Sequence, residues 1–197
     1  MKHAVEGIFA TPIYCAYIEN SQQLYTEYLS IADKLCFFDT PEMWGNPQKL
    51  TTRDFKDNIV QTHNMEIFKE MIDQNLGFYL NKLGFSPQKY DYKLTSWITS
   101  NEKGDYSPVH NHLDADISGV YYYQTNGNDG NIFFLTPALV MTNSIFSKFA
   151  DNYHIKPEAG KLLMFPGWLQ HGVSTNRTQS HRKSLAFNID ILNIKES

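Results

Sequence analysis

Apolar residues in the first part of the chain stand at the spacing of helices. An apolar side chain recurs every three or four residues over 24–35, which predicts a helix that Asn20 or Ser21 caps. A longer stripe with the same spacing predicts a second helix over residues 65–83, which Gly84 ends. Helices therefore dominate the first part of the sequence.

After residue 90 the pattern changes to short runs of β-branched and aromatic residues that alternate with turns. The dipeptides Asn126-Gly127 and Asp129-Gly130 are typical of a hairpin. Short strands at this spacing indicate a sandwich or barrel. We therefore predict an α+β, mainly β fold in which N-terminal helices pack on a β core. The expected strands are Gly7–Ile18 (broken near Pro12), Tyr92–Thr99, Ile117–Gln124, Asn131–Leu135, Leu162–Phe165, Gly172–Thr175 and Lys183–Ile191.

The length of 197 residues fits one domain, which we predict to span residues 1–197. Residues 1–88 would supply the first strand and the helices, and residues 89–197 the β core. Between Phe38 and His63 the sequence is irregular, with two prolines and a glycine. Irregular stretches of this length often serve a function, and a lid over a cleft is one hypothesis for this one.

Composition narrows the classes of function. Hydrophobic residues make 42% of the chain and charged residues 19%, which argues against disorder. The net charge of −4 disfavours a nucleic-acid partner. No apolar run approaches the ~18 residues that span a membrane, and the first residues lack the apolar segment of a signal peptide, so we expect a soluble cytoplasmic protein with no membrane partner. Cys15 and Cys36 are too few for a disulfide framework, and we expect both to be small buried side chains.

One segment concentrates side chains that bind metals. His110, His112 and Asp114 stand at alternate positions, and in an extended segment such positions point to one side. His112 with Asp114, or His110 with His112, could therefore bind one metal ion, and His171 is the candidate that completes the set. Two histidines and one carboxylate form the facial triad of non-haem Fe(II) oxygenases, whereas the His-x-His pair with His171 would form a three-histidine site. We expect no catalytic side chain beyond this metal centre.

A possible carboxylate-binding pair of residues follows His171 in the sequence. Arg182 and Ser184 would lie on one face of a strand, where a guanidinium and a hydroxyl can bind a carboxylate by charge-assisted hydrogen bonds. That arrangement fits the distal carboxylate of 2-oxoglutarate. The alternative is a surface cluster of basic residues with Arg177, His181 and Lys183.

In their order, His112-x-Asp114, His171 and Arg182-x-Ser184 resemble the Fe(II)- and 2-oxoglutarate-dependent oxygenase superfamily. The chain is similar to a group of such oxygenases found in marine bacteria and phages. The resemblance implies a double-stranded β-helix (a cupin-like jelly roll) and a dioxygenase, most simply a hydroxylase. It implies Fe(II) on His112, Asp114 and His171, 2-oxoglutarate on Arg182 and Ser184, and dioxygen as oxidant. The segments that carry the finer similarity are Phe9–Tyr14, Ser96-Trp97, Ser118–Tyr122, Phe165–His171 and Arg182–Asn188.

Tyr122 receives a role through the same resemblance. In the related prolyl hydroxylases, a tyrosine in the strand after the first metal ligands hydrogen-bonds the carboxylate of the co-substrate. The corresponding residue in this sequence is Tyr122, within Val120-Tyr121-Tyr122. The resemblance thus implies that Tyr122 contacts 2-oxoglutarate beside Arg182 and Ser184.

A cupin-type metalloenzyme that does not use 2-oxoglutarate is an alternative. Gly104 followed by His110-x-His112 resembles the first half of the cupin motif, and Gly160, Pro166 and His171 resemble the second. The acidic position of the motif holds Asp116 rather than a glutamate. A non-enzymatic binding module on the same barrel is a further alternative. No pattern in the sequence selects the substrate, small molecule or peptidyl, or the oligomeric state.

Overall fold

The structure is a computed structural model that describes residues 10–40, 49–52, 56–85, 89–137, 145 and 152–195. It confirms both helices predicted from the apolar spacing, at nearly the predicted bounds. Within the described residues, no helix has the length and apolar character needed to span a membrane. The helices are α1 (Ser21–Ile31), the 3-10 helix η1 (Ala32–Lys34), α2 (Ile59–Thr62) and α3 (Glu66–Lys82).

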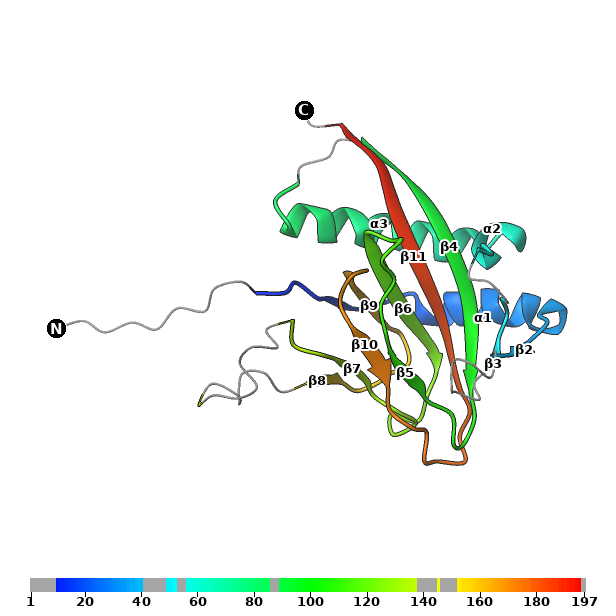
Figure 1. Cartoon of the computed structure of the whole chain (residues 1–197). Coiled ribbons are helices and arrows are strands. Elements are labelled where there is room, and N and C mark those ends of the chain that lie inside the picture. Colours follow the sequence, from blue (N-terminus) through cyan, green and yellow to red (C-terminus); the bar gives the residue numbers. More distant parts are fainter. Residues whose placement is uncertain are drawn as a thin grey trace.

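The strands form two antiparallel sheets, with α1 and α3 on the outer side of the larger one (Figure 1). The larger sheet has seven strands in the order β1-β9-β6-β11-β4-β3-β2, and the smaller has four in the order β5-β10-β7-β8. This is the two-sheet arrangement of a double-stranded β-helix. The strands are β1 (Tyr14–Tyr17), β2 (Phe38–Asp39), β3 (Lys49–Leu50), β4 (Lys89–Asn101), β5 (Ser107–His110), β6 (Ile117–Gln124), β7 (Ile132–Phe134), β8 (Tyr153–Ile155), β9 (Lys161–Pro166), β10 (His171–Val173) and β11 (Arg182–Lys195).

Side chains along β6 alternate between the helices on one face of the larger sheet and the smaller sheet on the other. Tyr121 and Tyr123 face the helices, where Tyr123 stacks on Tyr28 of α1 (ring centroids 4.8 Å apart) and Tyr121 meets Phe68 of α3 edge-on at 5.7 Å. Tyr122, between them, belongs to a second apolar cluster between the two sheets. Each buried aromatic ring contributes on the order of 2 kcal/mol through loss of contact with water. The outer face of β6 therefore packs against the helices, and its inner face borders the space between the two sheets.

The amino end of α3 is capped by a side chain from another helix. Met65, the residue before α3, makes no capping hydrogen bond through its own side chain. The carboxylate of Glu27 in α1 accepts hydrogen bonds from the backbone N–H groups of Ile67 (2.9 Å) and Phe68 (3.0 Å) instead. Partial burial raises the pKa of Glu27, while these two N–H groups act in the opposite direction. A single carboxylate thus joins the two helices that cover the sheet.

Three sequence-based expectations differ from the structure. Cys15 and Cys36 are exposed rather than buried; Cys15 lies on the edge strand β1, whose residues alternate in burial, and on the face away from the helices. The stretch Phe38–His63 contains β2, β3 and α2, although residues 41–48 and 53–55 of it lie outside the described residues. Strands β5 and β8 were not predicted; they have only four and three residues, too few to show an alternating pattern.

We predict that Glu27→Ala lowers the free energy of unfolding by about 1–2 kcal/mol, because two helix N–H groups lose their partner. Urea denaturation followed by circular dichroism measures the change. Glu70→Ala, which replaces an exposed glutamate of α3, is the matched control and is expected to change stability by less than about 0.5 kcal/mol. Equal effects of the two substitutions would contradict the capping role.

Candidate metal centre

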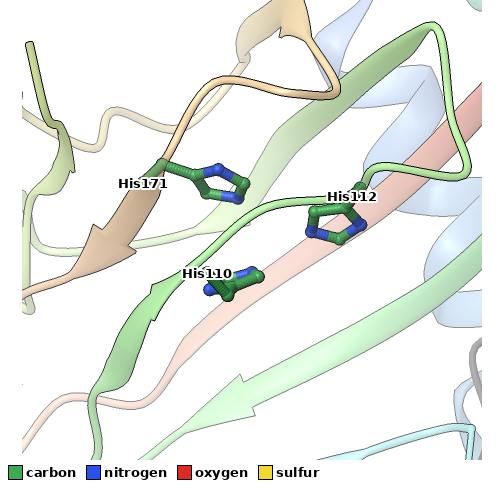
Figure 2. Close-up of side chains that lie close together, drawn as sticks. All are labelled: His110, His112 and His171. Carbon is green, nitrogen blue, oxygen red and sulfur yellow. The ribbon is translucent and has the colours of Figure 1, made fainter. Parts of the chain in front are cut away.

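Three histidine side chains meet between β5 and β10. His110 ends β5 and His171 begins β10, and the two are direct partners in the antiparallel pairing of these strands. His112 lies two residues beyond β5. The ligand atoms of the three side chains all lie within 4.8 Å of one another, and their rings gather around a common point (Figure 2). Strand pairing therefore brings together residues that are about 60 positions apart in the sequence.

Two backbone hydrogen bonds hold the His112 loop against the loop that precedes His171. The N–H of His112 donates to the carbonyl of Gly167 (2.8 Å), and the N–H of Gly167 donates to the carbonyl of Asp116 (3.0 Å). A Cβ at position 167 would lie 2.1 Å from the carbonyl oxygen of Ala115, so only glycine allows this approach. The ring of His112 stacks on Trp97 of β4, with centroids 6.0 Å apart. These contacts fix His112 relative to His171.

The three imidazoles are prepared to act as neutral ligands. The Nδ1 atoms of His110 and His171 lie 2.8 Å from the carbonyl oxygens of Pro108 and Leu169. Protonation of Nδ1 for these bonds leaves the Nε2 lone pair for a metal ion. Burial lowers the pKa of all three histidines. The pKa of His112 falls to about 4 and that of His171 to about 3, mainly because of burial and further because of the charge of neighbouring histidines. Neutral imidazole is the form that binds metals, so this donor set fits Fe(II).

Asp114 does not join this cluster in the structure. The expectation that His112 and Asp114 share a side assumed an extended segment, but the backbone turns at Leu113 and Asp114. The N–H of Ala115 donates to the carbonyl of His112 (3.0 Å) across this turn. The side chain of Asp114 is exposed at the edge of the cavity described next. Burial raises the pKa of Asp190 there, and the charge of Asp114 adds to this effect.

A cavity of about 680 Å³ runs along the inner face of the larger sheet and includes the three histidines. Arg182, Ser184 and Tyr122 line one end of it, and Ser184 pairs directly with Tyr122 between β11 and β6. The hydroxyl of Ser184 lies 2.7 Å from that of Thr99. Burial raises the pKa of Tyr122 to about 12, so that its phenol keeps its proton at neutral pH. The three residues thus present hydrogen-bonding groups together.

Arg182 is the buried cation of this end of the cavity. It is only 3% exposed, which rules out the alternative of a surface basic cluster. Its guanidinium donates to the carbonyl oxygens of Gly130 (2.7 Å) and Asp129 (3.2 Å), whereas its Nε has no hydrogen-bond partner among the described residues. Burial lowers the pKa of Arg182, yet a guanidinium stays charged at neutral pH. An unpartnered N–H on a buried cation is suited to an anionic ligand.

Sequence reasoning missed several residues that line the opposite end of the cavity. Asn188 and Asp190 continue the face of β11 that carries Arg182 and Ser184, and Thr95 and Lys93 stand opposite them on β4. The alternation of β11 could have identified Asn188 and Asp190. The β4 residues could not be found from sequence, because their position depends on the register between two strands.

Comparison with known proteins agrees with this architecture. Residues 95–188 match the family model described as "Putative 2OG-Fe(II) oxygenase". Among solved structures, a Pseudomonas putida prolyl-4-hydroxylase has a TM-score of 0.62 at 13% identity and covers 91% of this chain and 92% of its own. HygX from Streptomyces hygroscopicus, crystallised with nickel and 2-oxoglutarate, has a TM-score of 0.64 at 14% identity and covers 94% and 85%.

The α-ketoglutarate-dependent epimerase SnoN from nogalamycin biosynthesis has a TM-score of 0.64 at 10% identity, covering 91% of this chain and 77% of its own. At these identities the three solved structures show a shared fold. No curated protein matches the chain in sequence.

We predict that Gly167→Ala weakens metal binding at least about 10-fold, because the added Cβ pushes the His112 loop away from His171. Anaerobic calorimetric titration with Fe(II) measures the affinity. Gly77→Ala in α3 is the matched control, since a Cβ there meets its nearest neighbour, the Tyr90 hydroxyl, at an ordinary 3.5 Å. Wild-type Fe(II) affinity in Gly167→Ala would contradict the role of this loop contact.

Proposed function

We propose that this protein, whose residues 95–188 match the 2OG-Fe(II) oxygenase family model, is a hydroxylase that oxidises a C–H bond of its substrate at the three-histidine centre. The observation that carries the proposal is one cavity that holds both a metal-type histidine cluster and a buried arginine with an unpartnered N–H. The first group suits Fe(II) and the second suits the carboxylate of 2-oxoglutarate.

We propose His110, His112 and His171 as the protein ligands of Fe(II). Their ligand atoms already lie within 4.8 Å of one another, and two of the rings are oriented by backbone carbonyls. The triad His112, Asp114 and His171 is the other set that the sequence pattern allows. It would require the turn at Leu113 to open so that Asp114 could replace His110, and this is why we prefer the three-histidine set.

Arg182, Ser184 and Tyr122 would bind the distal carboxylate of 2-oxoglutarate. Transfer of a carboxylate from water to a buried site costs several kcal/mol unless charged donors meet it. Arg182 supplies the charge, and the carbonyl oxygens of Gly130 and Asp129 hold its guanidinium in place. The hydroxyls of Ser184 and Tyr122 can supply further hydrogen bonds from the same end of the cavity. Such a buried cation suits an anionic ligand, and 2-oxoglutarate provides a carboxylate for it.

When bound, Fe(II) would couple the decarboxylation of 2-oxoglutarate by dioxygen to substrate oxidation, so that R–H, 2-oxoglutarate and O₂ give R–OH, succinate and CO₂. The residues of the protein then have three tasks. The histidines would hold the metal, and Arg182 would fix the direction of the co-substrate. Trp97, buried beside His112, excludes water from the centre.

We predict that Arg182→Ala weakens 2-oxoglutarate binding about 10- to 100-fold, because charge-assisted hydrogen bonds are lost. The measurement is an anaerobic titration of the Fe(II) protein with 2-oxoglutarate, followed through the visible charge-transfer band. Arg177→Ala removes an exposed arginine near the same strand and should leave the affinity unchanged. The proposal fails if wild-type protein gives no band, or if the two variants bind 2-oxoglutarate equally.

We predict that His110→Ala lowers Fe(II) affinity at least about 100-fold, whereas Asp114→Ala changes it less than about threefold. Metal analysis and calorimetry on protein purified without chelator provide both values. The reverse ranking would select the triad of His112, Asp114 and His171. Absence of bound metal in the wild-type protein under these conditions would favour a non-enzymatic binding module.

A further inference from the structure

The cavity has two ends of different character, separated by the metal centre. Along the inner face of β11, Ala186 pairs with Trp97, on which the His112 ring stacks. On β11, Arg182 lies four residues before Ala186 and Asp190 lies four residues after it. Each of the two is therefore about 13 Å along the strand from Ala186. Arg182 is 3% exposed, whereas Asp190 is half-buried and its partner Lys93 is exposed. The Asp190 end is therefore the open one.

Opposite charges face each other at the open end without forming an ion pair. Lys93 and Asp190 are direct cross-strand partners of β4 and β11, and both line the cavity. Such partners have Cβ atoms about 5 Å apart. Among the described residues, no salt bridge within 4.0 Å and no side-chain hydrogen bond involves either of them. An ammonium and a carboxylate are thus held side by side, and both remain available to a ligand.

Hydrogen-bonding groups connect this pair to the metal centre. Asn188 lies one step closer to the histidines on β11, opposite Thr95 on β4. The amide oxygen of Asn188 accepts a hydrogen bond from the hydroxyl of Ser118 (2.9 Å), which leaves its NH₂ group without a partner among the described residues. The wall between the charged pair and the iron site is therefore polar and can orient a ligand.

Building on the proposed function, we propose that the substrate is a free α-amino acid, whose ammonium group binds Asp190 and whose carboxylate binds Lys93. An α-amino acid carries its two charges on one carbon, and this spacing matches two side chains that start about 5 Å apart. A ligand with one sign of charge would meet a repelling group at this end, and a metal cation is disfavoured by Lys93. The side chain of the amino acid would extend past Asn188 and Thr95 to the metal centre.

The reaction then breaks a C–H bond in the side chain of the amino acid and forms a C–O bond with one oxygen atom of O₂. The second oxygen atom enters succinate, as 2-oxoglutarate is oxidised and loses CO₂. The product is a hydroxylated amino acid. All reactants are those of the proposed function, and Lys93 and Asp190 act in recognition.

The test uses protein loaded with Fe(II) and 2-oxoglutarate under anaerobic conditions and titrated by calorimetry with each of the twenty proteinogenic L-amino acids. At least one is expected to bind with a dissociation constant between about 1 μM and 1 mM. Its N-acetyl derivative and its methyl ester, which each lack one charge, are expected to bind at least about 10-fold more weakly. Addition of oxygen to the bound complex should increase succinate formation.

Two variants test which residue binds the carboxylate of the amino acid and which binds its ammonium group. Lys93→Gln should remove the preference for the amino acid over its methyl ester, and Asp190→Asn should remove the preference over its N-acetyl derivative. Lys34→Gln and Asp33→Asn, which replace exposed residues of η1 outside the cavity, should keep both preferences. The comparison of derivatives in wild-type protein needs no variant, so it stands even if a variant does not fold.

The outcomes separate the inference from the proposed function. If 2-oxoglutarate binds and is slowly turned over, but none of the twenty amino acids binds, the inference is overturned and the proposed function stands. Equal binding of the amino acid and its two derivatives also overturns the inference. If the charge-transfer band itself is absent, the proposed function fails and the inference fails with it.

Discussion

The antiparallel ladder that joins β11 to β4 on one side and to β6 on the other is the constraint on which the rest of the structure depends. Because side chains alternate along a strand, each of these strands serves two layers at once. Leu185, Phe187 and Ile189 of β11 face the helices, while Arg182 and Ser184 face the cavity. A slip of one residue would exchange the two faces and place charged groups in the core. The apolar packing under the helices therefore also fixes the direction of the residues in the site.

The histidine cluster adds a second constraint, because His110 and His171 belong to the smaller sheet and His112 lies just beyond β5. Pairing of β5 with β10 sets His110 opposite His171, and the contact of His112 with Gly167 closes the third side. Both contacts are made by backbone hydrogen bonds, which fix the backbone positions from which the three histidine side chains extend. Such preorganisation suits a centre that must hold a metal ion while leaving positions open for other ligands.

The charge and burial of the lining residues differ between the closed end, the middle and the open end of the cavity. At the closed end, Arg182 is buried and held by two carbonyl oxygens, and burial of this cation is unfavourable until an anion meets it. In the middle, burial keeps the histidines neutral. At the open end, Lys93 is exposed and Asp190 is half-buried. The cavity thus changes from one buried cation at the closed end to charges of both signs at the open end.

The local periodicity of the sequence determined the helices and the facing of residues along β11. The apolar spacing predicted both long helices, and the alternation of β11 placed Arg182 and Ser184 on one face, because helix and strand periods depend on neighbouring residues alone. The sequence also identified His112 and His171 as members of one site. It left the choice between His110 and Asp114 open, and only the tertiary structure showed a turn at Leu113 and the pairing of His110 with His171. The pair of Lys93 and Asp190 likewise arises from the register of strands about 100 residues apart, which no local pattern encodes.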